Sequence, residues 1–307
     1  MAESMTWVDE LVSRVKARCQ KNASLAPLTT FRIGGPADVL VEPSDDDEVL
    51  QALRVIRELG VPFTMLGGGS NVLIGDGGIR GVTMRLTGKL SAVVTSENGK
   101  RVDVGAGASF AKLTKACMAL GWPRSNGWVG TPGTVGGAFI MNAGSREGEV
   151  GEHVESIRLI DGDEVRVLTR EQCGFAYRTS AFPKGSLLLG GVLRCNHADP
   201  GKAAEIQAMA SASLKRRHAS QPKEHGAGSI FKNPPGDYAG RLIEAAGLKG
   251  TREGGALISP VHANFIVNAG GATARDVVTL AERCQREVMA KSGVQLEWEV
   301  RRMGEFT

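Results

Sequence analysis

Two glycine-rich loops are the segments of this sequence most able to do chemistry. The first, LGGGSNVLIGDGG at residues 66–78, directly follows a short apolar stretch typical of a strand. Successive glycines let several backbone N–H groups point into one concavity, which binds anions. A wide structural turn is the alternative for this loop taken alone. The expected ligand contacts are Gly67, Gly68, Gly69, Ser70 and Asn71.

The second loop begins at residue 127 and reads GWVGTPGTVGG, continuing to residue 144. Its glycines recur at every third position, which suits a backbone packed closely against a flat or charged ligand. Threonine hydroxyls here could donate to phosphate, although a structural turn again remains possible. The expected contacts are Gly130, Thr131, Pro132, Gly133, Thr134, Gly136, Gly137 and Asn142. Two such loops in neighbouring small units together favour a dinucleotide lying between the units.

The common nucleotide-binding motifs are absent from the sequence. Gly105-Ala106-Gly107 is followed by Phe110 where a dinucleotide fingerprint needs its third glycine. Gly88-Lys89 is followed by Leu90 rather than by the Ser or Thr of a P-loop. A bound nucleotide would therefore lie in neither of these cradles.

The elements that position the two loops can be predicted from caps and periodicity. Ser44 precedes a helix with acidic residues in its first turn and Gly60 at its end, and strands are expected at 61–66 and 82–86. Further along, Ser109 precedes a helix that Gly121 ends. The other expected strands are 92–95 and 101–104 (a hairpin turning at 97–99), 157–160, 164–168, 187–193, 263–271 and 294–303, and the other expected helices are 1–19, 201–218, 239–247 and 274–291.

Strands and helices mix without a steady alternation, which favours an α+β fold over a doubly wound sheet. At 307 residues the chain is long enough for two or three domains. The expected division is an N-terminal helix at 1–21, compact subdomains at 22–86 and 87–195, and a C-terminal domain at 196–307.

The composition excludes several classes of protein. The net charge of +4 suits an anionic small-molecule ligand, and the Lys/Arg stripe of a nucleic-acid binder is missing. The cluster Lys215-Arg216-Arg217-His218 is expected to be a solvated helix end, with phosphate contact as the alternative. The five cysteines form no CxxC pair, so neither a metal site nor a disulfide framework is expected. An acidic N-terminus without an apolar core, and no run of ~18 apolar residues, predict a cytoplasmic protein without membrane insertion.

A series of motifs together resembles the UDP-N-acetylenolpyruvoylglucosamine reductase family. They occur in the family's order and cover roughly residues 22–307: TTFRIGGPAD, LGGGSNVLIGDGG, GTPGTVGGAFIMNAG, AYRTSAF, GSIFKNP, RLIEAAGLKG, HANFIVN and LEWEVRRMG. The resemblance implies an α+β fold. Its FAD-binding region would be of the PCMH/vanillyl-alcohol-oxidase type, made of two subdomains, followed by a C-terminal α+β domain that binds a UDP-sugar.

The resemblance also implies an activity. NADPH would reduce FAD, and the enolpyruvyl group of UDP-N-acetylglucosamine enolpyruvate would then be reduced to give UDP-N-acetylmuramate for peptidoglycan precursor synthesis. FAD is expected to be non-covalent, because no histidine lies in the first subdomain. No obligate protein partner is evident.

The resemblance assigns three catalytic residues. Arg178 in AYRTSAF would bind the substrate carboxylate, Glu299 in LEWEVRRMG would hydrogen-bond the enolate as an acid, and Ser229 in GSIFKNP would protonate carbon. Tyr177 and Asn233 would contact substrate. Without the family, the alternatives are a surface or ion-pair residue for Arg178, an exposed strand acid for Glu299, a loop or cap serine for Ser229 and a core residue for Tyr177.

The sequence departs from the family at several places. One is residues 142–149, NAGSREGE, where many relatives read NAGAYGGE, so local flavin or substrate contacts would differ. Ser220-Gln221-Pro222 stands where many members carry a lysine before Gln-Pro, so a pyrophosphate contact would have to come from Lys223 instead. The interval between Arg178 and Ser229 is too short for the tyrosine-bearing loop of long-form members, which indicates the short, type II form. The alternatives are an FAD-dependent sugar or alcohol oxidase of the same fold, and a UDP-sugar-binding protein without redox chemistry.

Overall fold

The computed structural model describes residues 6–96 and 98–306, and the chain divides into two compact units. The first unit is Met1–Cys19, Val41–Gly68 and Met84–Arg217. The second is Gln20–Leu40, Gly69–Thr83 and His218–Thr307. The division into an N-terminal helix and three parts that the sequence suggests stays a prediction.

The N-terminal segment is less helical than expected. Helix α1 spans Trp7–Arg14, and Val15 already has extended backbone angles. The chain continues as strand β1, Arg18–Ser24. The prediction of a helix through residue 19 is therefore wrong beyond Arg14, because the following residues pair with a sheet rather than with their own helix.

Helix α2 spans Asp46–Glu58 and shows the predicted caps, shifted by one residue. Its N-cap is Asp45, which accepts a hydrogen bond from the Glu48 N–H at 3.1 Å. Ser44 instead donates its N–H and its hydroxyl to the Glu48 carboxylate, at 2.7 and 2.9 Å. Gly60 follows the helix at φ +63°, as a helix terminator does.

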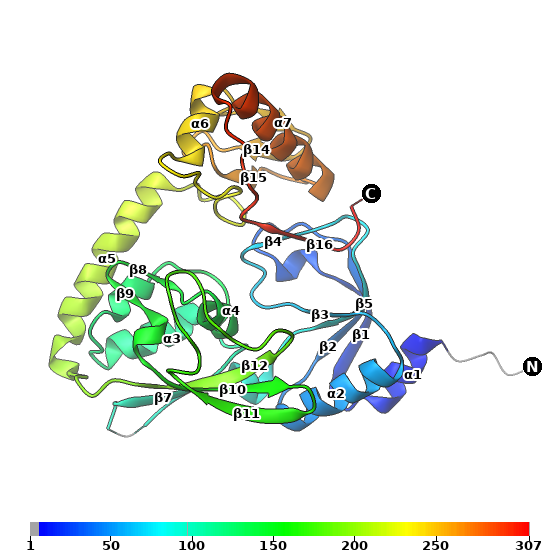
Figure 1. Cartoon of the computed structure of the whole chain (residues 1–307), viewed down its shortest axis with the longest axis vertical. Coiled ribbons are helices and arrows are strands. Elements are labelled where there is room, and N and C mark those ends of the chain that lie inside the picture. Colours follow the sequence, from blue (N-terminus) through cyan, green and yellow to red (C-terminus); the bar gives the residue numbers. More distant parts are fainter. Residues whose placement is uncertain (1–5, 97, 307) are drawn as a thin grey trace, which may run out of the picture. The chain divides into compact units, whose positions relative to one another are not determined.

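Two larger sheets form most of the strand structure (Figure 1). One has the order β1-β2-β5-β3, with β2 at Pro36–Glu42, β3 at Phe63–Met65 and β5 at Ile79–Met84. The other, in the first unit, has the order β11-β10-β12-β7-β6. Its strands are β6 Val93–Thr95, β7 Arg101–Gly105, β10 Val154–Asp161, β11 Glu164–Thr169 and β12 Leu187–Arg194. The predicted β6–β7 hairpin is confirmed, and Glu97 of its expected turn lies outside the described residues.

Helices α3, Phe110–Ala119, and α4, Val135–Ile140, lie in the same unit as this second sheet. Two fully buried tryptophans belong to its core, and Trp122 donates its ring N–H to the Gly99 carbonyl at 2.8 Å. The two-residue strands β8, Gly144–Ser145, and β9, Gly148–Glu149, pair with each other. The long helix α5 spans Ala203–Ser220.

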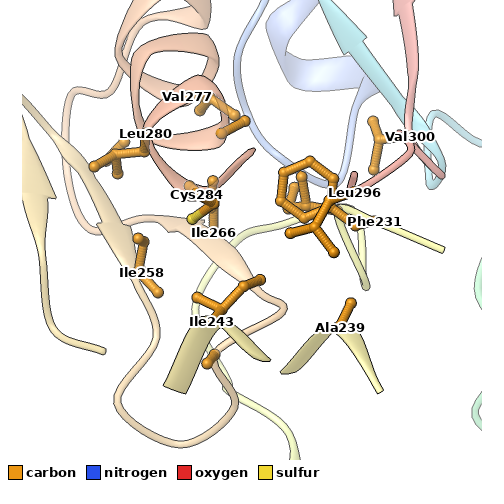
Figure 2. Packing of buried hydrophobic residues seen from close by; sticks show 14 of the residues in the cluster. Phe231, Ala239, Ile243, Ile258, Ile266, Val277, Leu280, Cys284, Leu296 and Val300 are labelled. Atoms are coloured by element: carbon orange, nitrogen blue, oxygen red, sulfur yellow. The ribbon is translucent and has the colours of Figure 1, made fainter. Parts of the chain in front are cut away.

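The second unit contains a compact helical and sheet core. Helices α6, Ala239–Ala245, and α7, Ala274–Ser292, accompany a three-stranded sheet of β13 Arg252–Glu253, β14 Ala256–Ile258 and β15 Ile266–Asn268. Figure 2 shows the apolar side chains between these elements, including Ile258, Ile266, Leu280 and Cys284. Helix α7 starts with a Thr273–Asp276 capping box and ends at Gly293.

The last strand is shorter than the sequence suggests. Only Arg301–Met303 forms strand β16, which pairs in parallel with β4, Val72–Ile74. Before it, Leu296 and Val300 point into the core close to Phe231 (Figure 2). The expected strand from residue 294 is therefore wrong in its first half, where the chain makes only an isolated bridge between Phe231 and Trp298.

The structure contains no disulfide among its cysteines, and Cys117, Cys173, Cys195 and Cys284 are buried thiols. In the described ranges, no cluster of three His, Cys, Asp or Glu side chains could hold a metal ion. Within those same ranges, every helix is too short or too polar to span a bilayer.

Candidate active site

The two glycine loops meet within the first unit. A Cβ atom added at Gly68 would lie 2.6 Å from the Cα of Gly133, and one added at Gly67 would lie 3.0 Å from the hydroxyl of Thr134. Only glycine at position 68 allows this approach of two backbones. The sequence predicted both loops separately, and the structure places part of one directly against part of the other.

Several backbone N–H groups at this contact have no acceptor among the described residues. Within the described part of the chain, the N–H groups of Gly67, Gly68, Gly133 and Thr134 donate to no protein acceptor. Their neighbours are satisfied, since Leu66 N–H donates to Met84 and Val135 N–H to Ala108, each at 2.9 Å. Backbone donors are rarely left unpaired unless a ligand or water takes them. Such a row of backbone donors can bind an anionic group.

The remaining loop residues differ in their surroundings. Gly136 packs against Ala106, whereas Gly137 is exposed, and a Cβ added there would make an ordinary contact with the Thr134 hydroxyl at 3.9 Å. Gly69 approaches the Leu28 carbonyl so closely that a Cβ there would lie 2.2 Å away. Ser70, Thr131 and Pro132 make no side-chain hydrogen bond within the described residues. Their expected ligand contacts stay predictions.

Arg217 corrects one expectation. The sequence places it on a solvated helix end, but its guanidinium is partly buried and donates to the Val129 carbonyl at 3.0 Å. It covers Gly130, whose φ is +72° and whose added Cβ would lie 2.7 Å from the Arg217 Nη1. Burial and the charge of Arg178 both lower the pKa of Arg217. The first unit therefore brings the guanidinium groups of Arg178 and Arg217 near each other. The sequence of the helix alone could not predict this, because Arg178 lies outside it.

Arg178 and Tyr177 lie at the tip of a tight turn in the first unit. Tyr177 is 81% exposed, which excludes the alternative of a core residue. The guanidinium carbon of Arg178 lies 5.8 Å from the centre of the Tyr177 ring. Both side chains therefore extend outward from the turn and do not pack in the core.

Ser229 and Glu299 belong to neighbouring segments of the second unit. The N–H of Glu299 donates to the Ile230 carbonyl at 2.8 Å, and the N–H of Lys232 donates to the Glu297 carbonyl at 2.9 Å. Segments 229–232 and 297–300 therefore run side by side. The proposed proton donor and the proposed acid come from positions far apart in sequence but adjacent in this unit.

Asn71 supports the Glu299 segment. Its side-chain amide donates to the Glu299 carbonyl at 3.3 Å, and its own carbonyl accepts from the Arg301 N–H at 3.0 Å. The first glycine loop thus fixes the backbone of the expected catalytic glutamate. This contact was not predicted, because residues this far apart in sequence cannot be paired by periodicity.

Asn264 is a second residue whose role the sequence did not reveal. It is 3% exposed, accepts from the Phe231 N–H at 3.0 Å and donates to the Phe231 carbonyl at 2.8 Å. Its backbone carbonyl also accepts from the Ile230 N–H at 2.9 Å. Asn264 therefore holds the strand-like segment that follows Ser229. The signal was a polar residue within the apolar run of HANFIVN.

Asn233 organises the start of helix α6. Its side-chain oxygen accepts from the Ala239 N–H at 3.1 Å. This bond uses one acceptor of the amide and leaves its NH₂ group for a ligand. The expected substrate contact from Asn233 is compatible with this geometry and stays a prediction.

Comparison with known proteins decides the family. The family model for an FAD binding domain matches residues 37–169, and the model for the C-terminal domain of UDP-N-acetylenolpyruvoylglucosamine reductase matches residues 221–303. A UDP-N-acetylenolpyruvoylglucosamine reductase of Anaeromyxobacter dehalogenans is 45% identical over 303 residues, covering 98% of this chain and 91% of that protein. This chain belongs to the UDP-N-acetylenolpyruvoylglucosamine reductase family.

Other relatives agree with this assignment. The protein of the same name from Myxococcus xanthus is 43% identical over 305 residues, covering 96% of this chain and 97% of that protein. The crystal structure of the Thermus caldophilus family member is 35% identical, with a TM-score of 0.75 over 93% of this chain and 99% of that chain. The predicted family is confirmed, as is the α+β fold of an FAD-dependent oxidoreductase with a family-specific C-terminal domain.

Proposed function

We propose that this chain carries a hydride from NADPH, by way of FAD, to the enolpyruvyl group of UDP-N-acetylglucosamine enolpyruvate. The product would be UDP-N-acetylmuramate, a peptidoglycan precursor. The observation that carries the proposal is the side-by-side placement of the Ser229 and Glu299 segments in a member of this reductase family. The reaction balances as alkene plus NADPH plus one proton giving the saturated product and NADP⁺.

When bound, FAD would supply the redox chemistry, that of a hydride carrier between NADPH and the terminal carbon of the substrate alkene. Hydride addition there builds negative charge on the adjacent carbon and its carboxylate, as an enolate. A site accelerates such a step by stabilising charge where it develops. The protein's part is therefore to hold that carboxylate and to supply one proton.

Arg178 is proposed to bind the substrate carboxylate, since a guanidinium fork matches a planar carboxylate with two parallel hydrogen bonds. Glu299, in its protonated form, donates a hydrogen bond to the enolate oxygen. Ser229 then gives its hydroxyl proton to the carbon next to the carboxylate and regains one from its surroundings. The exposed Tyr177 and the free amide NH₂ of Asn233 are proposed to contact the UDP-sugar.

The FAD contacts are proposed at the meeting point of the two loops and along them. Gly67, Gly68, Gly133 and Thr134 offer backbone donors that no acceptor in the described residues takes. We place the reaction in the cytoplasm, which the four buried thiols support, because reduced cysteines persist in a reducing compartment.

The experiment that tests this function follows NADPH consumption by purified protein. Consumption that requires the enolpyruvyl UDP-sugar, with UDP-N-acetylmuramate formed in equal amount, supports the proposal. Oxygen consumption with a sugar or alcohol and without NADPH would favour the oxidase alternative. Protein that binds the UDP-sugar but never takes up FAD would favour a binding protein without redox chemistry.

A further inference from the structure

The turn that carries Arg178 is held in a conformation that its sequence does not favour. Ala176 and Thr179 exchange two backbone hydrogen bonds of 3.1 Å, so Tyr177 and Arg178 are the two central residues of a hairpin turn. Arg178 has φ +57°, in the left-handed region. Turns with a positive φ at the second central residue usually have glycine there. A larger residue in this region is strained and persists only where its surroundings hold it.

Asn142 holds the turn in this conformation by a hydrogen bond. Its amide donates to the Ala176 carbonyl at 3.1 Å, which is the same carbonyl that closes the turn. The amide also donates to the Glu149 carboxylate at 2.7 Å, and its oxygen accepts from the Gly151 N–H at 2.9 Å. At 3% exposure, Asn142 is enclosed by these partners. Both amide N–H groups donate to acceptors of the protein itself, so any contact with FAD would come from other atoms of this residue.

A second tether acts in parallel. The hydroxyl of Ser180, two residues after Arg178, donates to the Ile140 carbonyl at 2.8 Å. Ile140 ends helix α4, which begins immediately after Thr134 of the glycine loop. The segment 140–142 therefore connects the proposed FAD loop to the Arg178 turn through two hydrogen bonds.

Repulsion between like charges adds a second reason for such a tether. Arg178 and the partly buried Arg217 carry like charges close enough for Arg178 to lower the pKa of Arg217. Repulsion between them favours movement of Arg178 toward solvent, because its turn is exposed.

We propose that Asn142 is a positioning residue that fixes the Arg178 turn, and with it the guanidinium that receives the substrate carboxylate. The inference rests on the proposed role of Arg178. An asparagine suits the position for two reasons. Its amide provides two donors and an acceptor, and asparagine tolerates the left-handed backbone found here, at φ +42°.

The test is Asn142→Gly, which removes the amide without forcing a Cβ into a left-handed position. FAD content and the rate of flavin reduction by NADPH should stay within about twofold of the parent. Reoxidation by the enolpyruvyl UDP-sugar should slow by about 10- to 100-fold, the effect of misplacing a group that must be aligned. In an Arg178→Ala background, Asn142→Gly should add almost nothing to this loss, because the two residues act as a unit.

The matched control is Asn126→Ala. Asn126 is a buried asparagine of the same unit that bonds a carboxylate, Glu147, at 3.4 Å, but it does not contact the turn. This variant should leave both half-reactions unchanged. Equal slowing of both half-reactions by Asn142→Gly, or full additivity with Arg178→Ala, would overturn the inference.

A second variant covers a failure of Asn142→Gly to fold. Ser180→Ala removes the parallel tether from an exposed position and should slow only the reoxidation step, by about threefold, close to the loss of one neutral hydrogen bond. An unchanged reoxidation rate would contradict the tether model. A parent protein that never reoxidises with the substrate would instead contradict the proposed function, so the two failures are distinguishable.

Discussion

Glu299 and Glu297 lie two residues apart on the same segment, yet their surroundings differ. Glu297 is exposed and forms an ion pair with Lys232 at 3.3 Å. The Glu299 backbone is fixed on both sides, by the Ile230 carbonyl and by the Asn71 amide. Glu299 is exposed as well, so the two acids differ in the ion pair of the Glu297 carboxylate and in the backbone contacts of Glu299.

We predict that Glu299→Gln lowers turnover by about a hundredfold or more, because a positioned group that stabilises developing negative charge contributes on this order. FAD content should not change. The control is Glu297→Gln, which removes only an exposed ion pair of small energetic value and should leave turnover as it is. Equal turnover in the two variants would remove Glu299 from the mechanism.

His153 connects residue chemistry to stability. Its ring lies 5.4 Å from the Trp122 ring and 5.5 Å from the Trp128 ring, and its Nε2–H donates to the Pro123 carbonyl at 3.1 Å. Burial lowers the pKa of His153 below its ordinary value near 6.5. The folded state therefore resists protonation at this site, and its stability contribution is complete above pH ~6.5 and lost as the pH falls toward the lowered folded pKa.

We predict that the unfolding free energy of the parent protein falls between pH 7 and pH 5, and that His153→Gln flattens this dependence. Burial also lowers the pKa of His262, so part of the slope should remain. Arg124 lowers the pKa of Glu152, whose contribution is lost only at more acid pH. Chemical denaturation at several pH values measures the slope, and an identical slope in the variant would refute the role of His153.

At the scale of elements, local signals predict helices well because caps and apolar faces are local. Helix α7 agrees with its expected range within a residue, since Thr273, Asp276 and Gly293 mark both ends. The last strand was predicted too long because apolar residues such as Leu296 are consistent with either a strand or an extended core segment. The glycine content of the two loops suggests that they approach each other closely. It does not show that Gly68 is the residue that meets Gly133.

We predict that Gly68→Ala weakens FAD binding by about tenfold or more, which corresponds to ~1.4 kcal/mol. The added methyl would meet the Gly133 backbone, which cannot yield as a flexible side chain would. Gly162→Ala is the control, because nothing lies within 4 Å of its Cβ position in the β10–β11 turn. The control should lose some stability from its φ of +64° but keep its FAD affinity. Titration of apoprotein with FAD measures both, and equal affinities would refute the loop contact.

At the scale of the whole molecule, each unit is assembled from separated stretches of chain. The order of motifs along the sequence identified the family and the fold class. It did not reveal that Asn71 would hold the Glu299 backbone, or that Asn264 would hold Phe231, because such pairings arise only after folding. The candidate site was thus predictable as a set of residues, whereas the contacts that fix them were not.

The proposed role of Ser229 as proton donor is tested most directly by an anaerobic two-step experiment on Ser229→Ala and the parent protein. Each is first reduced with NADPH, and the enolpyruvyl UDP-sugar is then added while flavin absorbance is followed. We expect both proteins to be reduced at similar rates and only the parent to be reoxidised, forming UDP-N-acetylmuramate. Rapid reoxidation of Ser229→Ala with product formation would contradict this role.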